Sequence, residues 1–283
     1  MELWFTEQQD EDVRFSIKVD EPLVSATSKY QRIDIFKSKE FGRVLVLDGC
    51  LMVTEKDEYI YHEMITHTAL SVKPDIKSVL VIGGGDGGTV RELCKYDKIE
   101  RIDLVEIDKE VIEYSKEFLP FTASKLEDPR VNIFVEDGLP FVRKKTGEYD
   151  LIIVDSTDPF GPGESLFTKE FYGNCHNALT EDGILINQHE STFYKSYRDE
   201  MERTHKKISS IFKIAEVFQA HIPTYPSGHW LFGFASKKLH PVNDYNPENF
   251  LKTGIKTRYY NEKLHIGAFY LPNSVKESLE IYE

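Results

Sequence analysis

The chain has 283 residues and a formal net charge of −13 at pH 7, and 40% of its residues are hydrophobic, as in a globular protein of one or two domains. The acidic balance argues against nucleic acid as a partner, because binding it needs basic patches, and it suits a cationic ligand. The sequence has no apolar run of about 18 residues, no signal-peptide pattern and no Cys-x-x-Cys pair, so we expect a cytoplasmic protein with reduced thiols and no membrane partner.

The first 55 residues are expected to form a small antiparallel β domain with one sheet. Short strands are predicted where alternating or β-branched residues gather, over Arg14–Val19, Gln31–Lys37 and Gly42–Leu47. Asp48-Gly49 is a two-residue hairpin signal, which joins the last of these strands to another over Leu51–Thr54. A helix is predicted next, over Glu58–Ser71, because Ile60 and Met64 recur at helical spacing.

From Ser78 onward, apolar strands alternate with helical segments. Strands are predicted over 78–83, 101–107, 131–136, 149–155 and 183–188, and helices over 89–96, 108–118 and 167–179. This order predicts right-handed βαβ units and a parallel sheet with helices on both faces. Two further strands, over 214–223 and 229–237, are expected to be antiparallel. The expected fold is therefore α/β, with a Rossmann-like domain over 56–283 and a mostly parallel sheet.

A glycine-rich loop follows the first of these strands. Gly83, Gly85 and Gly88 form a G-x-G-x-x-G motif, and Glu106 follows at the end of the next strand, as in a nucleotide-binding fold. Asp86 lies inside the loop, where its carboxylate would repel the pyrophosphate of NAD. An S-adenosyl sulfonium is cationic and carries no phosphate, so Asp86 favours an S-adenosyl ligand.

Acidic residues also follow two later strands. Asp137 precedes Gly138 after the third strand, where it fits either an ordinary turn or an adenine contact. Asp155 ends the fourth strand, and Asp158 follows in a loop rich in proline and glycine. Carboxylates that meet at one edge of a sheet repel one another unless a cation compensates them, and a diamine dication is such a cation.

With these residues in place, the sequence resembles the spermidine synthase family, the polyamine aminopropyltransferases. The resemblance covers nearly the whole chain. The motifs that carry it are YQRIDIF (30–36), LDGCLMVTEKDEYIYHEM (47–64), VLVIGGGDGGTVRE (79–92), Glu106, EDG (136–138), DSTDPFGPGESLF (155–167) and IPTYPSG (222–228).

The resemblance implies transfer of an aminopropyl group from decarboxylated S-adenosylmethionine to putrescine, with spermidine and methylthioadenosine as products. It also implies homodimers or homotetramers and a reaction that needs no metal. Asp155 is the expected general base. The residues expected to contact the cofactor are Gln31, Gly83, Gly85, Asp86, Glu106, Asp137, Gly138 and Pro162. The residues expected to face the diamine are Tyr61, His62, Asp86, Asp158 and Tyr225.

Other possibilities stay open at this point. The acceptor could be cadaverine, agmatine or spermidine, and the chain could instead be a methyltransferase or an inactive polyamine-binding relative. His62-Glu63 begins like the zinc motif H-E-x-x-H, but the second histidine, His67, is one residue too late. At ~100° per residue the two rings would be about 140° apart on a helix, so no metal site is expected there.

Overall fold

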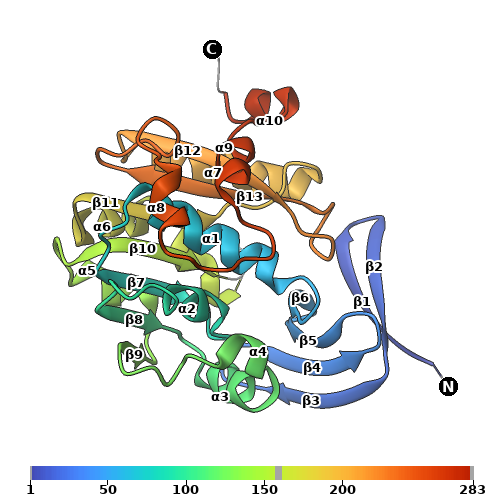
Figure 1. Ribbon diagram of the computed structural model, residues 1–283. Coiled ribbons are helices and arrows are strands. Elements are labelled where there is room, and N and C mark those ends of the chain that lie inside the picture. The colour runs from blue at the N-terminus through green and yellow to red at the C-terminus, as the bar shows by residue number, and fades with distance from the viewer. Residues whose placement is uncertain (1, 157–160, 281–283) are drawn as a thin grey trace.

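The computed structural model of the chain describes residues 2–156 and 161–280. In Figure 1 a group of N-terminal strands lies beside a larger body in which helices flank a twisted sheet. The strands are β1 (Leu3–Asp10), β2 (Val13–Val19), β3 (Glu21–Thr27), β4 (Arg32–Ser38), β5 (Gly42–Leu47), β6 (Cys50–Thr54), β7 (Ser78–Gly83), β8 (Arg101–Val105), β9 (Val131–Phe134), β10 (Tyr149–Asp155), β11 (Leu179–Gln188), β12 (Ile214–His221) and β13 (His229–Ser236). The helices are α1 (Glu58–Val72), α2 (Gly88–Leu93), α3 (Lys109–Phe118), α4 (Pro120–Ala123), α5 (Gly138–Arg143), the 3₁₀ helix η1 (Gly161–Phe167), α6 (Lys169–Ala178), α7 (Lys195–Ser209), α8 (Pro247–Leu251), α9 (Glu262–Ala268) and α10 (Asn273–Ser278).

The N-terminal strands form two antiparallel sheets, so the expectation of one sheet is wrong. Strands β1 and β2 pair as a hairpin that stands apart at one side of the molecule, and β3 to β6 form a four-stranded sheet (Figure 1). The predicted hairpin at Asp48-Gly49 is confirmed, with φ angles of 49° and 85° at its two residues. Both angles are positive, which is the requirement of the turn type that best matches the twist of paired strands.

The predicted parallel sheet is confirmed, with seven strands in the order β12-β13-β11-β10-β7-β8-β9. Strands β7 to β11 run parallel to one another, and β13 is antiparallel to both β11 and β12. Alternate side chains of β7 enter different cores: Val79 and Val81 pack on the side of α1, whereas Leu80 and Ile82 pack on the side of α6. Strand β7 is therefore buried on both faces, as its unbroken apolar run predicts.

The four-stranded sheet packs against α3 and the residues that follow it. Ile33, Ile35 and Leu45 form a hydrophobic cluster with Val111 of α3 and with Leu119. This contact brings the β5–β6 hairpin close to the carboxyl ends of β7 and β8, the edge at which parallel sheets bind ligands.

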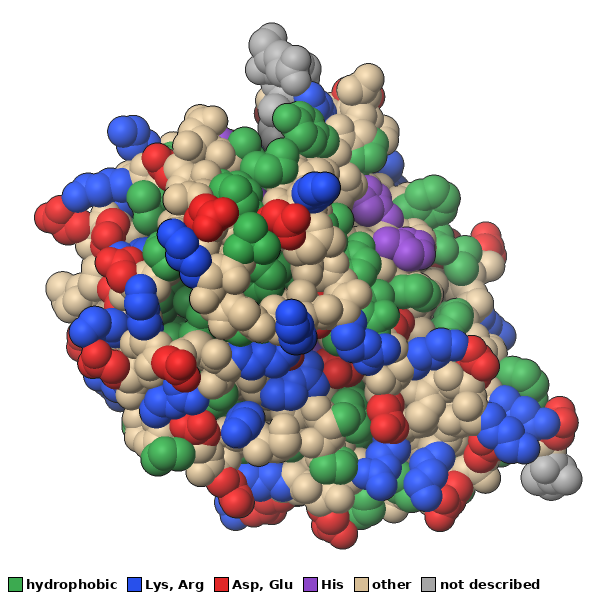
Figure 2. All heavy atoms as spheres, viewed as in Figure 1, with side chains coloured by type: hydrophobic (Ala, Val, Ile, Leu, Met, Phe, Trp, Pro, Cys, Tyr) green, Lys and Arg blue, Asp and Glu red, His purple; other side chains and the backbone are tan. Residues whose placement is uncertain are grey.

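Some segments differ from their predicted form. The helix expected over 89–96 ends at Leu93, and α7 was not predicted although four of its residues are buried. Among the helices in the described ranges, none is long and apolar enough to cross a membrane. Acidic and basic side chains are interspersed over the face that Figure 2 shows.

Candidate active site

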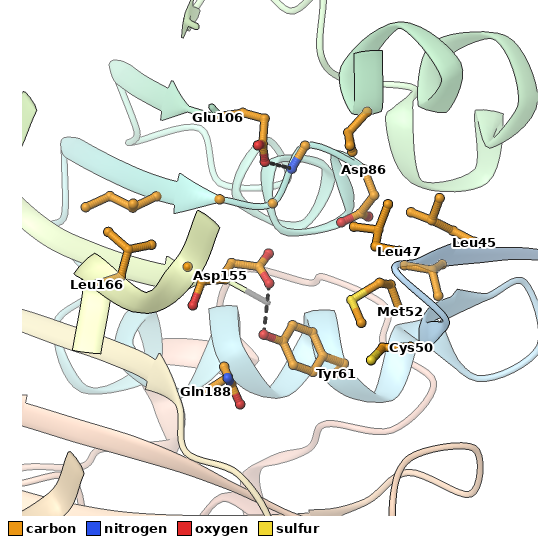
Figure 3. Close-up of a pocket in the computed structure, with 18 of the residues that line it drawn as sticks. Leu45, Leu47, Cys50, Met52, Tyr61, Asp86, Glu106, Asp155, Leu166 and Gln188 are labelled. Carbon is orange, nitrogen blue, oxygen red and sulfur yellow. Dashed lines mark hydrogen bonds between the residues drawn. The ribbon is translucent and has the colours of Figure 1, made fainter. Parts of the chain in front are cut away.

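A pocket lies where the β5–β6 hairpin faces the carboxyl ends of β7, β8 and β10 (Figure 3). It encloses about 1170 Å³ of space, the solvent at its mouth included. The hairpin contributes residues such as Leu47 and Met52, and the opposite wall contains Asp86, Glu106 and Asp155. One side of the pocket is therefore apolar, and the other is lined by carboxylates.

The first loop glycine is required by a close approach between two strand ends. Gly83 has a φ of +81°, and a Cβ there would lie 2.1 Å from the carbonyl oxygen of Asp155. No side chain can be accommodated at that distance, so β7 and β10 can end side by side only with glycine at this position. The predicted glycine loop thus brings Asp155 into the pocket wall.

Glu106 and Gln31 lie together at the cofactor end predicted from the sequence. Glu106 accepts hydrogen bonds from the N–H of Gly85 at 3.2 Å and from the N–H of Asp108 at 2.9 Å. Burial raises the pKa of Glu106 to about 7, although these two N–H groups oppose the rise. The side chain of Gln31 donates to Asp108 at 3.0 Å, which ties the N-terminal sheet to this wall.

The remaining predicted cofactor residues differ in how far they are described. Asp137 and Gly138 line the pocket, and Asp137 also caps α5 by accepting a hydrogen bond from the N–H of Leu139 at 2.9 Å. Asp137 is therefore a helix cap rather than a turn residue, and its contact with adenine stays a prediction. Asp158 lies outside the described residues, as does the side chain of Pro162.

Asp155 is held by hydrogen bonds to both of its oxygens. The hydroxyl of Tyr61 donates to Oδ1 at 2.8 Å, and the hydroxyl of Thr89 donates to Oδ2 at 2.6 Å. Burial, followed by the negative charge of Asp86, raises the pKa of Asp155 above its usual range. A fixed carboxylate that binds a proton more readily than usual is suited to act as a general base.

Asp86 is paired with a buried histidine. The Nε2 atom of His62 lies 3.4 Å from Oδ1 of Asp86, and its Nδ1 atom lies 2.6 Å from Oε2 of Glu58. Burial disfavours the charged ring, but Asp86 and Glu58 together raise the pKa of His62 to about 10. His62, Asp86 and Asp155 therefore form a cluster whose ligand atoms lie within 4.8 Å of one another.

Tyr225 lies at the other end of the pocket. Its hydroxyl donates to the carbonyl oxygen of Met52 at 2.8 Å, so this group is engaged with the hairpin. Its ring lies 5.9 Å from the ring of Tyr61 and 4.9 Å from that of Trp230. These three aromatic rings form a continuous wall between the hairpin and Asp155.

The comparisons with known proteins show the family of the chain. The spermine/spermidine synthase domain matches residues 58–246, and the spermidine synthase tetramerisation domain matches residues 3–55. The chain belongs to the spermine/spermidine synthase family, the polyamine aminopropyltransferases. Its resemblance to this family, predicted from the motifs, is therefore confirmed, and it is an enzyme of the transferase class.

Similar curated proteins and solved structures cover almost the whole chain. Polyamine aminopropyltransferases from Alkaliphilus oremlandii and Clostridium perfringens strain SM101 are 68% and 64% identical, each over 99% of both chains. A spermidine synthase in complex with the transition-state analogue AdoDATO has a TM-score of 0.97 and 42% identity, and covers 99% of this chain and 96% of its own. The spermidine synthase from Thermotoga maritima has a TM-score of 0.95 and 42% identity, with coverages of 99% and 95%.

Several pocket residues of this aminopropyltransferase were missed by sequence reasoning. Glu7 of β1 is buried and accepts a hydrogen bond from the N–H of Leu51 at 2.9 Å. Gln188 and Trp230 also line the pocket. The Nε1 atom of Trp230 and the hydroxyl of Ser156 are buried without a hydrogen-bond partner among the described residues. Most buried polar atoms have a hydrogen-bond partner, so these two atoms are exceptions in the pocket wall.

Proposed function

We propose that the enzyme transfers an aminopropyl group from decarboxylated S-adenosylmethionine to putrescine, giving spermidine and methylthioadenosine. The observation that carries this proposal is the half-buried carboxylate of Asp155, which accepts hydrogen bonds from Tyr61 and Thr89 in the wall shared by the nucleotide loop and the aromatic rings. The complex of a similar spermidine synthase with AdoDATO supports an S-adenosyl-type co-substrate.

The proposed nucleoside site lies between Glu106 and Asp137. Each oxygen of Glu106 already accepts one N–H and has a second lone pair for a ribose hydroxyl. Asp86 and Asp155 supply the negative charge that a sulfonium and its free amine require, and a phosphate would be repelled there. We propose Gln31, Gly83, Gly85 and Gly138 as further walls of this site, and we also propose that Pro162 contacts the nucleoside.

The proposed acceptor site lies along the aromatic wall. The methylene chain of a diamine can pack on Tyr61, Tyr225 and Trp230, and its ammonium ends can interact with these ring faces. Carboxylates also line this pocket: Asp155 accepts a hydrogen bond from Tyr61, Asp86 lies in the same pocket, and Glu7 accepts one from the N–H of Leu51 in the hairpin. Asp158, three residues after Asp155 in the sequence, is proposed to hold a charged end as well.

The attacking amine must be neutral. An alkylamine with a lysine-like pKa costs about 4–5 kcal/mol to deprotonate at pH 7. Acidic neighbours bind the dication but raise its pKa further, so binding and activation oppose each other. We propose a division of roles in which Asp86 and Asp158 hold charged groups, while Asp155 accepts the proton of the attacking nitrogen and Tyr61 orients it.

The transfer step is a displacement at the carbon beside the sulfonium. The lone pair of the neutral nitrogen forms the new N–C bond as the S–C bond breaks. The electron pair of that bond stays on sulfur, which becomes the neutral thioether of methylthioadenosine. The nitrogen becomes a secondary ammonium, and the proton taken by Asp155 passes to solvent when the products leave.

The assembly and location of the enzyme also remain proposals. The match of residues 3–55 to a tetramerisation domain supports an oligomer, either a homodimer or a homotetramer. We also propose that the reaction takes place in the cytoplasm, because the similar proteins are bacterial enzymes of polyamine metabolism.

An assay with several acceptors tests the proposed reaction. The protein is incubated with decarboxylated S-adenosylmethionine and, in turn, putrescine, cadaverine, agmatine or spermidine, and methylthioadenosine is quantified. We expect the highest kcat/KM with putrescine and no methylthioadenosine when S-adenosylmethionine replaces the decarboxylated form. A higher kcat/KM with another amine would change the acceptor, and absence of product with all four would overturn the reaction.

A further inference from the structure

Behind the pocket wall, an ion-pair chain leads from α2 to Asp86. The guanidinium of Arg91 binds both oxygens of Glu58, with Nη1 at 2.8 Å from Oε1 and Nη2 at 2.9 Å from Oε2. Oε2 of Glu58 also lies 2.6 Å from Nδ1 of His62, whose opposite nitrogen faces Asp86. Glu58 and Arg91 lie outside the residues that line the pocket, whereas His62 and Asp86 line it.

The position of the His62 ring is fixed by packing as well as by these bonds. A Cβ on Gly88 would lie 2.2 Å from Cε1 of His62, so the ring occupies the space that a side chain at the start of α2 would need. The N–H of Gly88 donates to Oδ1 of Asp86 at 2.9 Å, the same oxygen that faces His62. The last glycine of the loop motif therefore admits the imidazole and anchors Asp86 beside it.

We propose that Glu58, aligned by Arg91, is a positioning residue that holds His62 as a fixed cation against Asp86 and Asp155. This inference rests on the proposed function, because it assigns a task to the wall of the proposed acceptor site. The imidazolium compensates the two pocket carboxylates while the site holds no diamine. It thereby keeps Asp155 ionised and able to accept a proton.

The charged groups nearest to His62 are acidic, and they come from three different segments. Glu58 from its own helix, Asp86 from the glycine loop and Asp155 at the end of β10 are acidic, and Arg91 of α2 reaches Glu58 from behind. Tyr61 packs edge-on against the ring and donates to Asp155. His62 lowers the pKa of Asp155, whereas burial and Asp86 raise it. Loss of the positive charge on His62 must therefore raise the pKa of Asp155.

A double-mutant cycle on pH profiles tests this route. Glu58→Gln removes the anion that supports the imidazolium, and His62→Gln removes the cation itself. We expect each single change to move the acid limb of the kcat/KM profile upward by about one pH unit, which is about a ten-fold loss below that limb. In the double variant the two shifts do not add, because both changes remove the same charge. Additive shifts, or a wild-type profile for Glu58→Gln, would overturn the proposal.

Glu92→Gln is the matched control. Like Glu58, Glu92 is buried and binds Arg91, but it lies on α2 and its other partners are His67 and Lys95. We expect this variant to keep the wild-type acid limb even where thermal unfolding shows reduced stability. If the acid limb of Glu92→Gln moved as far as that of Glu58→Gln, any loss of buried charge near Arg91 would produce the effect. That result would overturn the specific role of Glu58.

A measurement on the charge of His62 needs neither turnover nor a folded Glu58 variant. The imidazole ¹⁵N signals of the wild-type protein are recorded from pH 6 to pH 9, and His62 is assigned by its absence in His62→Gln. We expect both nitrogens of His62 to stay protonated at pH 8. A neutral ring at pH 8 would overturn the inference, whereas inactivity of the wild type with every acceptor would overturn the proposed function instead.

Discussion

The hydroxyl of Tyr61 donates a 2.8 Å hydrogen bond to Oδ1 of Asp155 and thereby joins α1 to the end of β10 across 94 residues of sequence. Burial and the nearby charge of Asp155 raise the pKa of Tyr61, so its hydroxyl keeps its proton and stays a donor. The bond fixes the direction in which the other lone pairs of Asp155 point. A group that must receive a proton from a bound amine needs such a fixed direction.

Tyr61→Phe removes this bond and leaves the ring. We expect kcat/KM to fall about ten- to a hundred-fold, the range for a lost hydrogen bond to a charged group, with a smaller change in unfolding temperature. Steady-state kinetics with putrescine and a thermal melt provide the check. Unchanged kcat/KM together with an unchanged pH profile would show that the bond has no role in turnover.

Thr89→Val removes the other donor to Asp155 at nearly constant volume. The Thr89 hydroxyl lowers the pKa of Asp155, so its loss raises that pKa, and we expect the acid limb of kcat/KM to move to higher pH. Thr66→Val is the matched control, because Thr66 is fully buried in α1 and its hydroxyl has no hydrogen-bond partner among the described residues. Equal shifts in both variants would contradict a specific effect of Thr89.

Glu106→Gln tests the charge balance at the nucleoside end. Because the pKa of Glu106 is raised from 4.5 to about 7 in the folded protein, its contribution to stability is fully present below pH 4.5 and is lost as pH rises through 7. The amide does not titrate. The free energy of unfolding of the variant relative to wild type should therefore rise between pH 5 and pH 8, by about 3 kcal/mol at most. Denaturant unfolding at both values measures this difference, and a pH-independent difference would contradict it.

Gly83→Ala should disrupt the contact between the glycine loop and β10. The new Cβ would meet the Asp155 carbonyl oxygen at 2.1 Å, in addition to the strain of a positive φ. Gly147→Ala is the control, since Gly147 also has a positive φ, of 60°, but nothing lies within 4 Å of its Cβ. We expect about 1–2 kcal/mol of destabilisation for the control and clearly more for Gly83→Ala, with loss of activity. Equal melting temperatures of the two variants would refute the close approach.

The sequence predicts the larger sheet and part of the site because the signals are local. A continuous apolar strand such as β7 can be predicted from its own residues, without knowledge of the strands that pair with it. The glycine loop follows β7, and Asp155 ends another apolar strand, β10, so both could be located in the same way. The end of α2 was less predictable, because an apolar and charged helical pattern continues past Leu93 in the sequence while the helix itself ends there.

The rest of the site depends on contacts between distant segments. Glu7 reaches the pocket only because the β1–β2 hairpin packs beside β6. Its strand contains several polar residues, and no sequence signal distinguishes Glu7 as the one that lines a pocket. The pairing of Glu58 with Arg91 crosses 33 residues, and the bond from Tyr225 to Met52 crosses 173. The sequence shows which of these side chains are charged or aromatic. The tertiary fold decides which residue each of them contacts, and the sequence alone does not show it.

The role of Asp155 as the base is tested by one comparison between wild type and Asp155→Asn. Both proteins receive decarboxylated S-adenosylmethionine and putrescine at several pH values, and spermidine and methylthioadenosine are quantified together. We expect equal amounts of the two products from wild type and a kcat about 10²–10⁴-fold lower in the variant, whose residual activity no longer has the acid limb. Near wild-type turnover by Asp155→Asn, with the same pH dependence, would contradict this mechanism.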